Sequence, residues 1–182
     1  MAKLISKTYG EALFELAVEE NKIDTFMEEV NGLITVMEEN SELDSLLNHP
    51  KIMKEEKIKV METIFKGRIS DEVLGFLVLV IKKDRYKDLN AILDYFLIQV
   101  KEKKKIGIAY VTTAIELSEQ NKAEVSKRLI DTTHYQEMEM HYLVDSSIIA
   151  GMVIRIGDRV VDSSIATKLK DLQTNLLKIQ LA

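Results

Sequence analysis

Cysteine and tryptophan are absent from this 182-residue chain, proline occurs once, and glycine occurs seven times. The absence of cysteine excludes disulfide bonds and metal sites built on thiolates. Glycine and proline are the residues that most often interrupt helices. Because the chain has so few of them, we expect long helices over most of its length.

The chain also lacks a basic excess and a long apolar run. Its formal net charge is −5, which argues against nucleic acid as the main partner because phosphate binding needs a basic surface. The longest apolar run, Val73 to Ile81, is about half of the roughly 20 residues that a membrane-spanning helix needs. The N-terminal residues include glutamates and no uninterrupted apolar stretch, so they predict neither a secretory signal nor a transit peptide. We expect no direct membrane insertion.

The spacing of apolar residues changes near residue 105. Before it, apolar residues recur every three or four positions, which predicts helices over 3–21, 23–40, 41–48, 51–65, 70–83 and 86–105. Pro50 would lie at the start of the fourth helix. After it, alternation at Ile106, Ile108 and Tyr110 predicts strands. We therefore predict a mainly α protein, with a six-helix bundle in residues 1–105 and a small α+β domain in residues 106–182.

Side chains that could carry catalysis or bind a metal are few and unsuitably spaced. No histidine has a partner at metal-ligand spacing (His49, His134 and His141). Gly151 and Gly157 fit no phosphate-binding loop. Three aspartates are expected at a strand end, a hairpin turn and a helix cap (Asp145, Asp158 and Asp162). We expect no catalytic residues, no cofactor and no bound metal.

The first and fifth helices carry more apolar surface than one core stripe needs. On the first helix the predicted core stripe is Ile5, Tyr9, Ala12, Leu13 and Leu16. Phe14 and Val18 lie roughly opposite that stripe, and the fifth helix is apolar around its whole circumference. A groove between these helices would suit an amphipathic partner helix. Burial of both surfaces inside the bundle is an equally open alternative.

The last helix has a similar surplus. Apolar residues recur there at intervals of 4-3-4-3, as in a coiled coil: Ile165, Leu169, Leu172, Leu176 and Ile179. One stripe is needed to pack on the sheet. The excess could accept a helix from another chain, although an ordinary core helix would show the same pattern.

The segment from Val144 to Leu172, VDSSIIAGMVIRIGDRVVDSSIATKLKDL, predicts strand, turn, strand and helix. Gly157 and Asp158 form the turn, and Asp162 or Ser163 would cap the helix. This segment resembles the C-terminal signature of the delta subunit of F-type ATP synthases, the family of the mitochondrial oligomycin sensitivity-conferring protein. Weaker resemblances precede it in order, such as TYGEALFELA at 8–17. Ala150 and Ser163 stand where the family commonly has glycine.

The resemblance implies a non-catalytic stator subunit that couples ion-driven rotation to ATP synthesis. The helical domain would bind N-terminal helices of the alpha subunits in the catalytic headpiece, and the second domain would bind the C-terminal ends of the b subunits in the peripheral stalk. Our candidates for the headpiece contact are Phe14, Val18, Phe76 and Val80, and those for the stalk contact are Ile165, Leu169, Leu172 and Leu176. The expected location is the cytoplasmic face of a bacterial plasma membrane, held there through the complex. The alternative is a free-standing helical adaptor or regulatory protein unrelated to ATP synthase.

Overall fold

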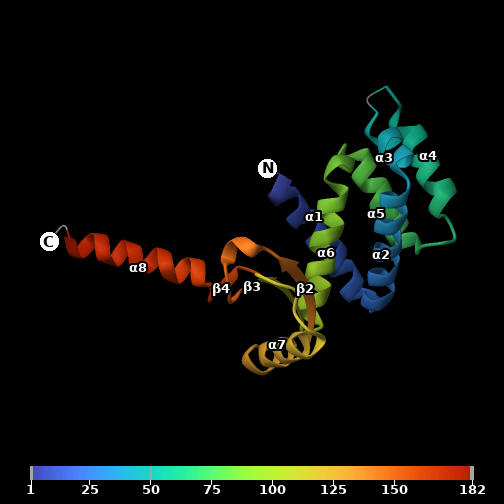
Figure 1. The fold of residues 1–182 in the computed structure, drawn as a ribbon. Helices are drawn as coiled ribbons and strands as arrows, with labels where there is room; N and C mark the ends of the chain where they lie inside the picture. Colours follow the sequence, from blue (N-terminus) through green and yellow to red (C-terminus); the bar gives the residue numbers. More distant parts are fainter. Residues whose placement is uncertain (1, 50, 181–182) are drawn as a thin grey trace. The chain divides into compact units, whose positions relative to one another are not determined.

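The computed structural model describes residues 2–49 and 51–180, with side chains for 4–40, 42–43, 45–49 and 51–174. The chain is mainly helical and has one small sheet (Figure 1). It divides into two compact units, Met1–Lys101 and Glu102–Ala182. The predicted boundary after residue 105 lies close to this division, in the turn between the last helix of the first unit and the first strand.

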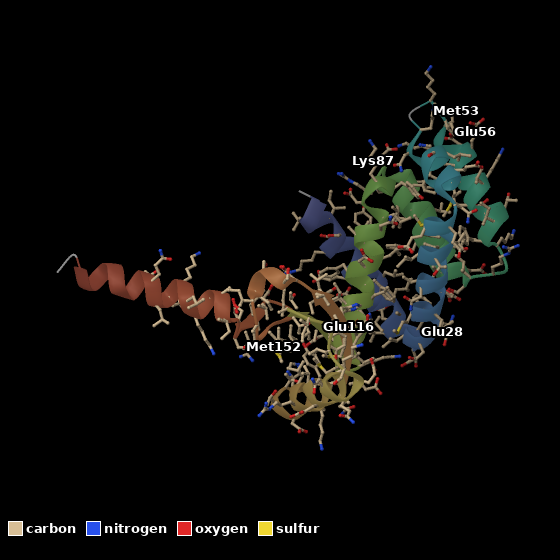
Figure 2. All side chains as sticks on the ribbon, viewed as in Figure 1. Glu28, Met53, Glu56, Lys87, Glu116 and Met152 are labelled. Carbon is tan, nitrogen blue, oxygen red and sulfur yellow. The ribbon has the colours of Figure 1, made fainter. Side chains whose placement is uncertain are left out.

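The first unit, called the helical unit below, is built from α-helices and one short 3-10 helix. These are α1 (Ala2–Glu19), α2 (Ile23–Glu39), α3 (Ser41–Asn48), α4 (Lys54–Phe65), α5 (Asp71–Lys82), η1 (Tyr86–Asp88) and α6 (Leu89–Lys103). Each buries residues at helical spacing, as Phe26, Val30 and Leu33 do on α2. Charged side chains such as Glu28, Glu56 and Lys87 are exposed on the outside of the unit (Figure 2).

Two helices differ from the sequence predictions, and the N-cap position of α5 has an unexpected partner. Helix α4 begins at Lys54 rather than at residue 51, and Pro50 lies outside the described residues. Ser70 is at the N-cap position of α5, but its hydroxyl donates to Glu29 Oε2 at 2.7 Å instead of capping the helix. The sixth predicted helix is divided into η1 and α6.

The second unit, called the sheet unit below, contains a four-stranded sheet in the order β2-β1-β3-β4. Its elements are β1 (Ile106–Thr113), α7 (Glu119–Thr132), β2 (Glu137–Val144), η2 (Ser146–Ile148), β3 (Met152–Ile156), β4 (Arg159–Asp162) and α8 (Ile165–Gln180). Strand β1 pairs in parallel with β2 and antiparallel with β3. The β3–β4 hairpin turns at Gly157 as predicted, with a φ of 54° there.

One face of the sheet is only half covered by α7. On that face Val111 is paired with Tyr142 of β2 on one side and with Ile154 of β3 on the other. Helix α7 packs against β2, where the Tyr142 hydroxyl donates to the Lys122 carbonyl at 3.2 Å. On the β3–β4 half of the same face, Met152, Ile154 and Ile156 are partly buried and Val161 is exposed.

Candidate functional site

A groove runs between α1 and α5 in the helical unit, and we call it the α1–α5 groove. Its volume is about 570 Å³. Helix α1 and helix α5 contribute all of its lining: Thr8, Tyr9, Ala12, Glu15, Leu16, Glu19, Glu72, Gly75, Phe76 and Leu79. Small residues create the space, since a β-carbon on Gly75 would meet nothing within 4 Å. Leu79 is 44% exposed beside that gap, so the groove offers an apolar side chain to solvent.

The charged residues that line the α1–α5 groove are all acidic, namely Glu15, Glu19 and Glu72. Glu72 accepts a hydrogen bond of 2.6 Å from Lys22, and this bond holds the pKa of the Glu72 carboxyl below its usual value. An apolar groove with carboxylates in its lining complements a helix with apolar residues on one face and basic residues beside them.

The four predicted headpiece-contact residues occupy different environments. Phe76 lines the α1–α5 groove and is largely buried. Phe14 is half-buried against the helical core, and Val18 is 37% exposed but outside the groove lining. Val80 is fully buried in the core, so its side chain is not available to a partner in this structure.

The sequence predicts a groove between these two helices, but most of the residues that line it are not among the predicted contact residues. Tyr9 and Leu16 of the predicted core stripe are partly buried against the core and also line the groove, whereas Ala12 is exposed. The fully buried core residues of α1 are Leu13 and Ala17. The sequence feature that indicates this groove is a pair of small residues, Ala12 and Gly75. Small side chains on facing helices leave room for a third element.

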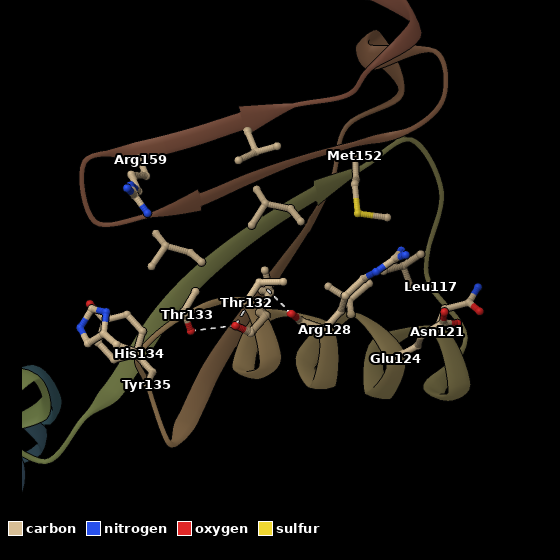
Figure 3. Close-up of a pocket in the computed structure, with 15 residues that line it drawn as sticks. Leu117, Asn121, Glu124, Arg128, Thr132, Thr133, His134, Tyr135, Met152 and Arg159 are labelled. Atoms are coloured by element: carbon tan, nitrogen blue, oxygen red, sulfur yellow. Dashed lines mark hydrogen bonds between the residues drawn. The ribbon is translucent and has the colours of Figure 1, made fainter.

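A second groove lies between α7 and the uncovered half of the sheet, and we call it the α7–sheet groove (Figure 3). Its volume is about 970 Å³. Alternate residues of β3 (Met152, Ile154 and Ile156) form one wall together with Val161 of β4, and Val125 and Leu129 of α7 face them. In Figure 3 the side chain of Met152 points from the sheet toward α7.

Basic side chains line part of the α7–sheet groove. Arg128 and Arg159 are exposed and have no carboxylate within ion-pair distance among the described residues, while Glu124 supplies one acidic group. At one end the Tyr135 hydroxyl donates to Glu102 at 2.9 Å, and burial raises the pKa of that phenol. The pattern of apolar walls with guanidinium groups differs from the acidic lining of the α1–α5 groove.

The third candidate surface is the apolar stripe of α8, formed by Ile165, Leu169 and Leu172. Leu169 is 52% exposed and Leu172 is 59% exposed. The sequence predicted that one stripe of this helix packs on the sheet, but α8 packs chiefly against η2 and the stripe remains open. The side chain of Leu176, the fourth predicted stalk contact, lies outside the described residues.

The three histidines and two of the three aspartates of the sequence analysis have local structural partners. Asp145 accepts from the backbone N–H of Ser147 at 2.9 Å, and hydrogen bonds from Ser147 lower the pKa of its carboxyl. His134 lies 3.5 Å from Glu102, and His141 stacks on Tyr110 with ring centroids 4.9 Å apart. Among the described residues, no three side chains of histidine or acidic type are grouped so that they could hold a metal ion.

Within the described part of the chain, no helix combines the length and the apolar character needed to cross a bilayer.

Comparison with known proteins gives consistent results. The family model for the ATP synthase delta (OSCP) subunit matches residues 5–176. A protein of Lachnoclostridium phytofermentans named ATP synthase subunit delta is 58% identical over 181 residues, covering 100% of both chains. The protein of the same name from Desulforamulus reducens is 35% identical over 173 residues, covering 95% of each chain.

Among solved structures, a chain of the Toxoplasma gondii mitochondrial ATP synthase hexamer has the same fold. It matches with a TM-score of 0.75 at 20% identity, over 94% of this chain and 97% of that chain. The resemblance found in the signature at 144–172 is thereby confirmed over nearly the whole sequence. The chain belongs to the ATP synthase delta (OSCP) subunit family.

Proposed function

We propose that this chain links the catalytic headpiece of an F-type ATP synthase to its peripheral stalk, with the helical unit on the headpiece and the sheet unit on the stalk. As a member of the delta family it is a structural, non-catalytic subunit of the stator. By holding the headpiece against rotation, it couples ion-driven rotation to ATP synthesis. Family membership does not support the alternative of a free-standing adaptor.

The observation that carries the headpiece assignment is the α1–α5 groove. We propose that α1 to α6 act as one six-helix bundle and that this groove receives an N-terminal helix of an alpha subunit. The lining on α1 extends from Thr8 to Glu19, which is roughly 16 Å or three helical turns. The acidic lining favours a partner helix with lysine or arginine beside its apolar face.

Binding of a peptide that copies the N-terminus of an alpha subunit tests this assignment by calorimetry. Leu79→Asp should weaken binding at least about tenfold, because a carboxylate would be desolvated in an apolar contact. Ile98→Asp is the matched control, since Ile98 is an exposed residue of α6 outside the groove lining. Equal affinity of the two variants would contradict the assignment.

For the stalk, we propose that the α8 stripe and the α7–sheet groove together bind the C-terminal ends of the b subunits. The stripe supports this because its large apolar side chains are exposed at the spacing of a coiled-coil seam. Leu169→Gln should weaken binding to a b-subunit fragment, whereas Lys170→Gln on the neighbouring polar position should not. Loss of affinity in both variants, or in neither, would argue against the stripe as the contact.

We further propose that the chain is peripheral to the membrane and lies on the cytoplasmic face of a bacterial plasma membrane. The support is its family membership and its similarity to bacterial delta subunits. Alkaline or chelator washing of membranes should release it together with the headpiece, and retention after removal of the headpiece and stalk would contradict the proposal.

A further inference from the structure

The root of α8 is held to the turn before β3 and to the first residue of β3 by two backbone hydrogen bonds and one from a serine hydroxyl. The N–H of Ile165 donates to the Ala150 carbonyl at 2.9 Å. The N–H and the hydroxyl of Ser163 both donate to the Met152 carbonyl, at 3.0 and 2.9 Å. Ser163 is thus bonded to the first residue of β3, and the first residue of α8 is bonded to the turn before β3, although a free connection of two residues would leave the helix able to swivel.

Side chains reinforce the same joint. Asp162 accepts from the Ser164 N–H at 2.8 Å and from the Thr167 hydroxyl at 2.7 Å. Ser164 is 2% exposed, and its hydroxyl accepts from the Thr167 N–H at 3.3 Å. Ser164 is therefore the residue that caps α8, instead of Asp162 or Ser163 as the sequence predicts. Asp162 ties the first turn of the helix to the end of β4.

The turn that receives these bonds has an unusual backbone. Ile149 has φ 69° and ψ −58°, and the Ala150 N–H donates to the Ile148 carbonyl at 2.9 Å, which defines a strained γ-turn. Gly151 follows with φ 85°, and a β-carbon there would lie 2.6 Å from the Ser163 carbonyl oxygen. Only glycine lets the root of α8 approach this closely.

We infer that residues 149–152 and 162–165 form a rigid mount, which fixes the direction of α8 relative to the sheet. We call these residues the α8 mount. This role rests on the proposed function, in which the stalk binds the α8 stripe. The mount would then transmit force from the α8 stripe to the sheet without rotation at the connection. It also gives the family signature a role as the support of this helix.

The absence of cysteine allows a direct test on the full chain. Spin labels on Lys170→Cys of α8 and Glu137→Cys of β2 report the distribution of distances between helix and sheet by pulsed electron resonance. The otherwise unchanged chain should give a narrow distribution. Gly151→Ala should broaden it at least about twofold, because the new β-carbon displaces the Ser163 carbonyl.

Gly157→Ala is the matched control. Gly157 also has a positive φ, of 54°, but a β-carbon there would meet nothing within 4 Å. This variant carries the same backbone penalty without touching the mount, so its distribution should stay narrow. A broad distribution in the parent chain, or an equally narrow one in Gly151→Ala, would overturn the inference.

If Gly151→Ala does not fold, Asp162→Ala replaces it. That change removes two bonds of the mount and should also broaden the distances, whereas Asp162→Asn keeps an acceptor for the Ser164 N–H and should restore most of the order. Unbroadened distances in folded Asp162→Ala would then overturn the mount.

Binding to the b-subunit fragment separates the mount from the proposed function. We expect Gly151→Ala to weaken that binding about tenfold and to leave binding of the alpha-subunit peptide unchanged. Broadened distances with unchanged stalk affinity would support the mount and overturn the assignment of α8 to the stalk.

Discussion

The ammonium group of Lys22 lies 2.6 Å from the carboxylate of Glu72, so the turn after α1 is tied to the first turn of α5. Glu72 also lines the α1–α5 groove. The ion pair therefore fixes one end of the surface that we assign to the headpiece. Its effect on stability should depend on pH.

The hydrogen bond that Lys22 donates to Glu72 lowers the pKa of the Glu72 carboxyl below its usual value and raises the pKa of the Lys22 ammonium above its usual value. The unfolded chain thus binds a proton at Glu72 more readily, and the contribution of the pair is lost as the pH falls below about 4.5. The contribution through Lys22 is lost as the pH rises above about 10.5.

Glu72→Gln should therefore lose less stability on acidification than the parent chain does. The loss is measured as the fall in the urea midpoint of unfolding between about pH 6 and about pH 3.5. Glu28→Gln, at an exposed position of α2, is the control and should leave that loss nearly unchanged. An acid loss in Glu72→Gln equal to that of the parent chain would mean that the pair does not contribute.

Val80→Asp should unfold the helical unit rather than release a partner. Val80 is fully buried, and an unpaired carboxylate there should cost on the order of 4 kcal/mol or more. Val18→Asp, at a partly exposed position of α1, should change stability by less than about 1 kcal/mol. Thermal melts by circular dichroism distinguish the two, and a folded Val80→Asp would show that this part of the core can open.

Gly10→Ala and Gly32→Ala should have opposite effects, although both glycines are inside helices. A β-carbon on Gly10 would lie 2.6 Å from Cδ1 of Tyr95 and 3.1 Å from the Ile92 carbonyl oxygen, so α1 and α6 must separate at a cost of about 1–3 kcal/mol. A β-carbon on Gly32 meets nothing, and alanine should stabilise α2 by about 0.5–1 kcal/mol.

Denaturant unfolding of the two glycine variants provides the measurement. A stable Gly10→Ala protein would show that Tyr95 can move aside. That movement would break the hydrogen bond of 3.2 Å that the Tyr95 hydroxyl donates to Glu11, and the pKa of the Tyr95 phenol would fall, because burial and this bond both raise it.

Residues 1–105 expressed alone should fold into a helix-rich protein that melts cooperatively. The fragment keeps all of α6, and its buried residues contact one another within the helical unit. Circular dichroism and calorimetry give the measurement. A fragment without a cooperative transition would mean that the helical unit needs the rest of the chain.

The sequence alone was enough for features that depend on neighbouring residues. The spacing on α2, the alternation in β1 and the glycine of the β3–β4 turn are local signals, because each is set within a few residues of backbone. The signature at 144–172 was enough to identify the family, because a sequence motif of this length fits few other families.

Only the tertiary structure decided which apolar surfaces remain open. Helix α1 is apolar over a wide arc, and its neighbours, not its own spacing, placed Leu13 in the core and Ala12 in a groove. The α7–sheet groove likewise follows from the strand order, because α7 packs chiefly on β2 and a groove remains between it and β3. Burial is a property of contacts between distant residues, so the periodicity of one helix cannot determine which of its faces is buried.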